Sequence, residues 1–382
     1  MWKAFSSKPG WMLVIVLAVV VSASQRAQAA GAGAAAGPDP QKLSLTVQKA
    51  VNFLATSQDQ DGSFTKPAGT GITALVTTAL LRSGRSTHDP VVAKALSCLQ
   101  GYVQKDGGIY TPGTTNQNYE TCVAIQCLVE ANRDGRYKKQ IAAAEKFLKR
   151  IQWGEEQGKD KSDRFYGGAG YGHSKRPDLS NTSFLVDALK SCGRGPEDEA
   201  MKKALVFVSR CQNLETEYNT TPFPAKNPDG GFYYTCAGEG GSAAGKTPEG
   251  GLRSYASMTY SGLKSMLYAG VGPNDPRVKA AVAWAAKHYD LNNNPGMAGK
   301  GLYYYYHVFA KALDAAGNDI FIDAQGQKHD WRKELYQAIA ERQKPDGSWV
   351  NGEDRWMEGD ANLVTGYALL ALSYCHPKAH AK

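Results

Sequence analysis

The chain lacks several features that would place it in a familiar class. Its 382 residues hold 44 Lys and Arg against 36 Asp and Glu, and these basic residues form no dense stripe like that of nucleic-acid-binding proteins. No apolar run reaches the length of about 20 residues that spans a membrane. The seven cysteines include no Cys-x-x-Cys pair, and an odd number in a large chain is no disulfide framework. We therefore predict no nucleic-acid partner, no transmembrane span in the mature chain and mainly structural cysteines.

Residues 1–29 have the pattern of a secretory signal peptide. Lys3 and Lys8 precede the apolar run from Trp11 to Val21, and Ala27-Gln28-Ala29 supplies small residues for cleavage. An uncleaved membrane anchor is the alternative, although the run is short for a span. We expect an exported protein, periplasmic or extracellular.

One short motif recurs along the chain: Gln, three residues, Gly, one residue and an aromatic residue. Self-similarity of this kind predicts a repeat fold, in which each unit buries its apolar face against its neighbours. We expect the Gln and the aromatic residue to tie adjacent helices together. The copies are Gln58/Gly62/Phe64, Gln104/Gly108/Tyr110 and Gln343/Gly347/Trp349, with looser ones at Gly167-Gly168 leading to Tyr171, Gly230-Gly231-Phe232-Tyr233 and Gly299-Lys300-Gly301-Leu302-Tyr303.

The motifs lie between an amphipathic helix and a helix that is apolar nearly all round. Leu43, Val47, Ala50 and Leu54 form one apolar stripe, whereas the segment after Gly62 predicts a helix buried on most sides. The pair occurs six times. The expected outer helices cover 43–54, 92–99, 141–151, 201–208, 278–289 and 331–339, and the inner ones 72–81, 118–129, 180–189, 255–267, 304–313 and 362–372.

Six such pairs predict an all-α protein, an (α/α)6 toroid of six outer and six inner helices. A closed ring leaves no apolar end to be capped, as an open solenoid would. We assign this domain to residues 41–376, between a flexible lead-in at 30–40 and a tail at 377–382. The long loops before the inner helices should gather at one rim, where binding functions usually lie. A small hairpin is predicted around Ala324-Gln325-Gly326.

These helix pairs and motifs resemble the terpenoid cyclase and protein prenyltransferase superfamily, and squalene–hopene-cyclase QW repeats above all. The resemblance covers Leu43 to Tyr374 and implies an isoprenoid-directed activity. The sequence departs from the family pattern, however. In class II cyclases, which it resembles, a DxDD motif carries the proton donor, and this sequence has no DxDD motif. It also has Tyr255 where the zinc-binding His of the prenyltransferases is expected, and the Asp-x-Cys pair is missing. We therefore predict no metal and no cofactor.

The start of the predicted inner helices holds the candidate site. Glu120 opens a largely apolar helix and could act as a general acid among tyrosines; Asp360 could act as an acid or cap its helix; His307 is either catalytic or a core histidine. Free N–H groups at these helix starts would suit an anionic or polar head group. The candidate ligand-binding residues are Tyr119, Tyr255, Tyr260, Tyr304, Arg253, Trp356 and Glu358.

Three functions stay open at this point. The first is an enzyme or binding protein for an isoprenoid or other lipid, since aromatic-lined holes favour such ligands. The second is a non-catalytic scaffold that binds a protein or a glycan at the loop rim. The third is a glycan-active enzyme, which would need two carboxylates facing each other across the hole.

Overall fold

The computed structural model describes residues 36–172 and 175–376, and this part of the chain is mostly helical. Its regular structure consists of twelve α-helices, as the six predicted helix pairs require, with four short 3-10 helices and one two-stranded hairpin. The predicted signal peptide, most of the lead-in and the tail at 377–382 lie outside the described residues.

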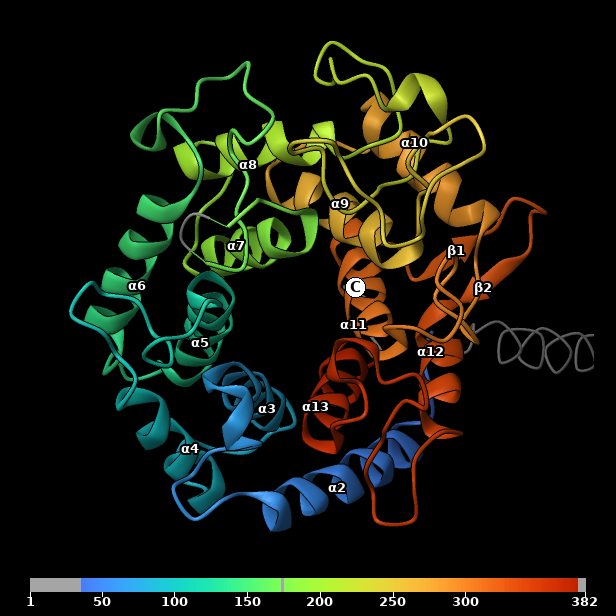
Figure 1. The fold of residues 1–382 in the computed structure, drawn as a ribbon. Coiled ribbons are helices and arrows are strands. Elements are labelled where there is room, and N and C mark those ends of the chain that lie inside the picture. Colours follow the sequence, from blue (N-terminus) through green and yellow to red (C-terminus); the bar gives the residue numbers. More distant parts are fainter. Residues whose placement is uncertain (1–35, 173–174, 377–382) are drawn as a thin grey trace, which may run out of the picture. The chain divides into compact units, whose positions relative to one another are not determined.

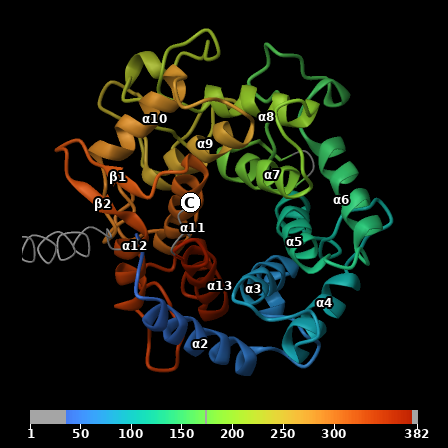
Figure 2. The same ribbon diagram turned by 180° about the vertical axis from the view of Figure 1, so that it is seen from behind.

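The described helices form two concentric layers (Figures 1 and 2). The six inner helices contact one another in chain order, and the last contacts the first. The inner helices are α3 (Thr70–Arg82), α5 (Gln117–Ala131), α7 (Leu179–Ser191), α9 (Ala256–Tyr268), α11 (Leu302–Ala316) and α13 (Ala361–Leu372). The outer helices are α2 (Pro40–Ser57), α4 (Pro90–Gln100), α6 (Lys138–Ile151), α8 (Glu199–Arg210), α10 (Pro276–Lys287) and α12 (Trp331–Ala340).

Local sequence explains where the outer helices begin. Asp39, Asp89 and Asp275 each accept a hydrogen bond from a backbone N–H of the first turn, and a proline follows each of them. An Asp cap satisfies an otherwise unpaired amide, and proline at the first helical position sacrifices no hydrogen bond. The predicted outer helix at 278–289 ends earlier than expected, because α10 stops at Lys287 and leaves Tyr289 beyond it.

In two of its three full copies the recurrent motif ties neighbouring helix pairs together, as predicted, whereas the side chain of Gln104 bonds only within its own turn. The side-chain amide of Gln343 donates to the carbonyl of Gly347 in its own turn and to that of Thr46 in α2, both at 3.0 Å. Gly347 has a φ of 92°, and a Cβ there would collide with the carbonyl of Lys49. Only glycine meets both demands. Since α12 and α2 are the last and first outer helices, this copy of the motif closes the outer layer.

A threonine on each of five inner helices completes the repeat. In the last unit the Trp349 amide donates to the hydroxyl of Thr365 at 3.2 Å, and both residues are fully buried. The bond satisfies a backbone group that the turn leaves unpaired. The other four pairs are Phe64 with Thr73, Ile109 with Thr121, Ala169 with Thr182 and Phe232 with Thr259.

The predicted hairpin is also present. Strand β1 (Ile320–Ile322) pairs antiparallel with β2 (Lys328–Asp330), with Phe321 opposite His329. The alternation puts Phe321 inward and leaves Ile320 and Ile322 exposed.

Candidate functional site

A cavity of about 240 Å³ lies at the N-terminal ends of the inner helices. Every inner helix contributes at least one lining side chain from its first two turns. In chain order, the six inner helices contribute Ile72, Tyr119, Phe184, Met258, Tyr304 and Leu363, one from each helix. The cavity is therefore a product of the complete set of helix pairs, because no single repeat encloses it.

Aromatic rings form most of the cavity wall. The ring of Phe184 meets Tyr119 edge-on, with centroids 5.1 Å apart, and stacks on Tyr304 at 6.1 Å. Tyr367 packs edge-on against Tyr304 at 5.9 Å. The Tyr304 hydroxyl shares hydrogen bonds with Ser180 at 2.9 Å and with a second serine, Ser261, at 3.3 Å. Such a wall buries apolar surface and presents ring faces to a ligand.

Glu120 lines the cavity, and its carboxylate is already engaged. It accepts hydrogen bonds from the Thr70 hydroxyl at 2.6 Å, the Thr111 amide at 2.8 Å and the Thr114 hydroxyl at 2.7 Å. Its polar neighbours are thus threonines from two segments, the start of α3 and the loop that leads into α5, and tyrosine hydroxyls make none of these bonds. The carboxylate joins the start of α5 to the start of α3, which is a structural task.

Glu358, also in the lining, holds the start of α11. Its carboxylate accepts from the Tyr304 amide at 2.8 Å and from the Asn351 side chain at 2.6 Å. It takes the place of a capping side chain, because the residue before α11 is Gly301. Burial raises the pKa of Glu358, and these hydrogen bonds limit the rise.

Other inner helices are also capped by the protein itself. Asp178 accepts from the Asn181 amide at the start of α7, and Asn294 from the Ser257 amide at the start of α9. The predicted ring of free N–H groups is therefore wrong at these positions. Protein acceptors, several of them acidic, occupy the place that an anionic head group was expected to take.

Six of the ten predicted site residues line the cavity: Tyr119, Glu120, Tyr255, Tyr304, Trp356 and Glu358. Asp360 lies outside the lining and caps α13, with its two oxygens accepting from the Leu363 amide and the Thr65 hydroxyl. Arg253 is exposed and donates to the Lys246 carbonyl, away from the lining.

Tyr260 and His307 are buried outside the cavity lining. The Tyr260 ring packs edge-on against Phe309, with centroids 5.0 Å apart. His307 lies 5.7 Å from the Tyr367 ring, and burial, with the charge of Lys311, moves its pKa well below the ordinary value. A neutral imidazole in the core fits the alternative reading of His307, that of a core histidine.

The mouth of the cavity carries backbone strain. Trp356 and Met357 have φ values of 60° and 64°, a left-handed backbone conformation that residues other than glycine and asparagine rarely adopt. Both line the cavity, and both are nearly half exposed, at 44% and 47%. Strain of this kind gathers at functional sites. Met357, Phe184 and Tyr367 are not among the site residues predicted from the sequence. Met357 belongs to no recognisable motif, and an aromatic residue in a helix can equally belong to the core.

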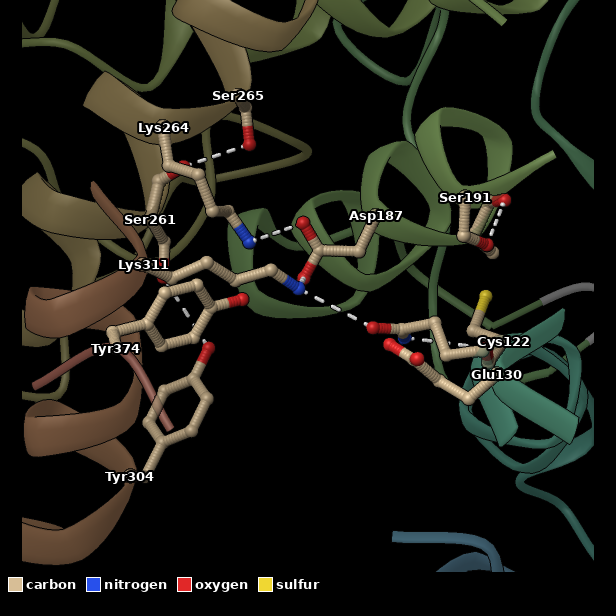
Figure 3. Close-up of polar contacts among 12 residues, drawn as sticks. Cys122, Glu130, Asp187, Ser191, Ser261, Lys264, Ser265, Tyr304, Lys311 and Tyr374 are labelled. Carbon is tan, nitrogen blue, oxygen red and sulfur yellow. Dashed lines mark hydrogen bonds and ion pairs between the residues drawn. The ribbon is translucent and has the colours of Figure 1, made fainter. Parts of the chain in front are cut away.

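Beneath the cavity, one buried carboxylate is shared by two buried lysines (Figure 3). Asp187 on α7 lies 2.7 Å from the Lys264 ammonium of α9 and 2.8 Å from that of Lys311 on α11. Lys311 is about two turns further along α11 than Tyr304. Burial lowers the pKa of Lys264 to about 8, and it also lowers that of Lys311. The charges of the two lysines outweigh burial at Asp187 and lower its pKa.

Two other kinds of site are absent from the described residues. No helix there is long and apolar enough to cross a membrane. No group of three or more His, Cys, Asp or Glu side chains in that part of the chain could hold a metal ion. All seven cysteines are free, and burial raises the pKa of most of them, to about 12 at Cys127.

The comparisons with known proteins confirm the predicted resemblance. Residues 63–236 match the squalene-hopene cyclase C-terminal domain family. The type II terpene cyclase MstE from Scytonema aligns with a TM-score of 0.50 and 16% identity, over 88% of this chain and 98% of that chain. A variant of a glycosidase aligns with a TM-score of 0.51 and 12% identity, over 89% and 99%. The chain therefore contains a terpene-cyclase-like helical domain.

These similarities support the fold and do not identify a reaction, because one fold hosts many functions. A variant of MstE, solved in complex with the substrate geranylgeranyl dihydroxybenzoate, aligns with a TM-score of 0.47 and 14% identity over 88% of this chain and 97% of that chain. No curated protein matches the sequence.

Proposed function

We propose that the chain is an exported (α/α)6 toroid that binds an isoprenoid or similar branched apolar ligand in its central cavity. One observation carries this proposal: all six inner helices converge on a single cavity whose wall is mainly aromatic and aliphatic. Ligand sites are typically apolar hollows with a few fixed polar groups. Here those groups are Glu120, Glu358, Asn116, Asn181 and Ser180.

The size of the cavity limits the ligand. Its volume of about 240 Å³ lies just below the range of roughly 300–1,000 Å³ that is usual for ligand pockets. A chain of a few isoprene units fills such a space, whereas a longer ligand has to extend through the mouth beside Trp356 and Met357. The half-exposed apolar surface of these two residues suits that path.

The lining carboxylates favour binding over proton transfer. A general acid must present a proton to its substrate, but Glu120 accepts three hydrogen bonds and Glu358 accepts a backbone amide. These hydrogen bonds also count against a glycan-active enzyme, because glycoside hydrolysis needs two carboxyl groups that act directly on the substrate. A glycan ligand stacked on the rings is the second candidate, and it is kept as an outcome of the test below.

Equilibrium dialysis of the purified full chain against labelled farnesol tests the proposal, with a soluble oligosaccharide as the competing probe. Trp356→Ala removes a half-exposed ring from the mouth. Loss of about 50 Å² of apolar contact is worth roughly 1 kcal/mol, so affinity should fall about fivefold. Tyr218→Ala is the matched control, because Tyr218 is 50% exposed and does not line the cavity.

A second variant fills the cavity. Met258→Trp adds bulk to the α9 side of the wall and should abolish farnesol binding, with circular dichroism checking that the helices are retained. Farnesol that fails to bind wild type, or that binds Met258→Trp equally well, overturns the proposal. If only the oligosaccharide binds, the protein is a glycan-binding protein instead. If neither probe binds, the non-catalytic scaffold becomes the favoured function. N-terminal sequencing of protein from its host tests export, with cleavage expected after Ala29.

A further inference from the structure

A second hollow of about 390 Å³ adjoins the aromatic cavity. Asn116, Tyr171 and Tyr234 line both spaces, so the two lie next to each other at these residues. The second hollow is more open and differs in chemistry, because Lys175 and Arg176 form part of its lining. Neither cation lines the aromatic cavity.

The backbone beneath these two cations is firmly placed. The indole N–H of Trp153 donates to the Lys175 carbonyl at 2.9 Å. Two residues after Arg176, Asp178 donates its amide to the Ala169 carbonyl at 3.1 Å. The side chains of Lys175 and Arg176 are exposed, and neither forms a salt bridge within the described part of the chain. Their charges therefore remain available to a ligand.

One acidic group faces the same hollow. Asp178 is buried and accepts from the Asn181 amide and from the Asn181 side chain, each at 2.8 Å. Burial raises its pKa to about 6, against these hydrogen bonds and the charge of Arg176. With Asp178 charged, the two cations still leave an excess positive charge. Asn116 makes no capping hydrogen bond with its side chain, which gives the junction of the two hollows a further polar group.

We propose that the second hollow binds an oxyanion, a phosphate or a carboxylate, carried at the end of the ligand whose apolar chain lies in the aromatic cavity. The inference rests on the proposed function, since it assigns a head group to the same ligand. Arg and Lys side chains bind such oxyanions through charge-assisted hydrogen bonds. The anion thus lies beside the cavity and away from the capped helix starts at its wall.

The test compares three probes that share one chain: farnesol, farnesyl monophosphate and farnesoic acid. Equilibrium dialysis with the full chain should give about tenfold tighter binding of at least one anion than of farnesol at low ionic strength. The advantage should shrink with added salt, because exposed charges are screened. The two anionic probes distinguish a phosphate from a carboxylate head group.

The variant Lys175→Met/Arg176→Met should lose the anion's advantage and bind farnesol as wild type does. Lys138→Met/Lys139→Met is the matched control, because it removes two exposed charges from the outer helix α6. Anions that bind no better than farnesol, or a control that loses as much as the test variant, would overturn the inference and leave the apolar cavity in place. Failure of all three probes would overturn the proposed function as well.

Discussion

The buried cluster of Asp187, Lys264 and Lys311 gives a sharp prediction about stability. The three side chains are at most 6% exposed, and one carboxylate faces two ammonium groups. Asp187→Asn leaves both lysines without a counter-charge. Removing one partner of a buried ion pair costs about 3–5 kcal/mol, because an uncompensated charge stays in the core. Lys264→Met instead leaves a neutral Asp187–Lys311 pair, so it should cost no more than about 1 kcal/mol or should stabilise the protein.

The pH dependence separates this reasoning from simple packing. Lys264 has its pKa lowered to about 8, against an ordinary 10.5. Between these values the unfolded chain binds more protons than the folded one, so the contribution of this lysine to stability rises with pH. Loss of Asp187 lowers the pKa of both lysines further. The deficit of Asp187→Asn should therefore shrink between pH 7 and pH 9 as the lysines lose their protons.

Urea unfolding followed by circular dichroism at both pH values measures these effects, with the slope checked to be unchanged. Equal losses in Asp187→Asn and Lys264→Met would refute the account, since the charge balance would then play no part. A deficit of Asp187→Asn that stays the same at pH 9 would refute it as well. The double variant Asp187→Asn/Lys264→Met should lie between the two, because one unpaired lysine remains.

Three further predictions follow from other positions. Gly347→Ala should cost about 1–3 kcal/mol in urea unfolding through its positive φ and its approach to α2; Gly352→Ala, with open space around it, should be nearly neutral, and equal losses would contradict this. The pKa of Asp178 is raised to about 6 from 3.8, so wild type loses stability as pH rises through that window; Asp178→Asn should be more stable than wild type by about 1–3 kcal/mol at pH 7 and not at pH 4. Native protein should react with a thiol reagent first at Cys98 and Cys192, the two half-buried cysteines, and more slowly than denatured protein, because burial raises their pKa; denatured protein should react at all seven.

The sequence by itself determined the helices and the repeat. Apolar periodicity is a local signal, because it depends on residues within a few turns of one another. The periodicity predicted all twelve helices of the described chain, with bounds that differ from the observed ones by up to three residues. The Gln and Gly of the motif could also be recognised in the sequence, because the turn between an outer and an inner helix uses them at the same spacing in each full copy.

Only the tertiary structure decided what the candidate residues do. Tyr255, the residue before α9, and Tyr260, within α9, are five positions apart, yet one lines the cavity and the other packs on Phe309, since the geometry of the helix start sets where each ring points. Glu120 meets three hydrogen-bond donors, and one of them, Thr70, comes from another helix, 50 residues earlier in the chain. Asp187 meets lysines from two other helices. A side chain's chemistry depends on neighbours that arrive from distant segments, and one-dimensional spacing does not specify them.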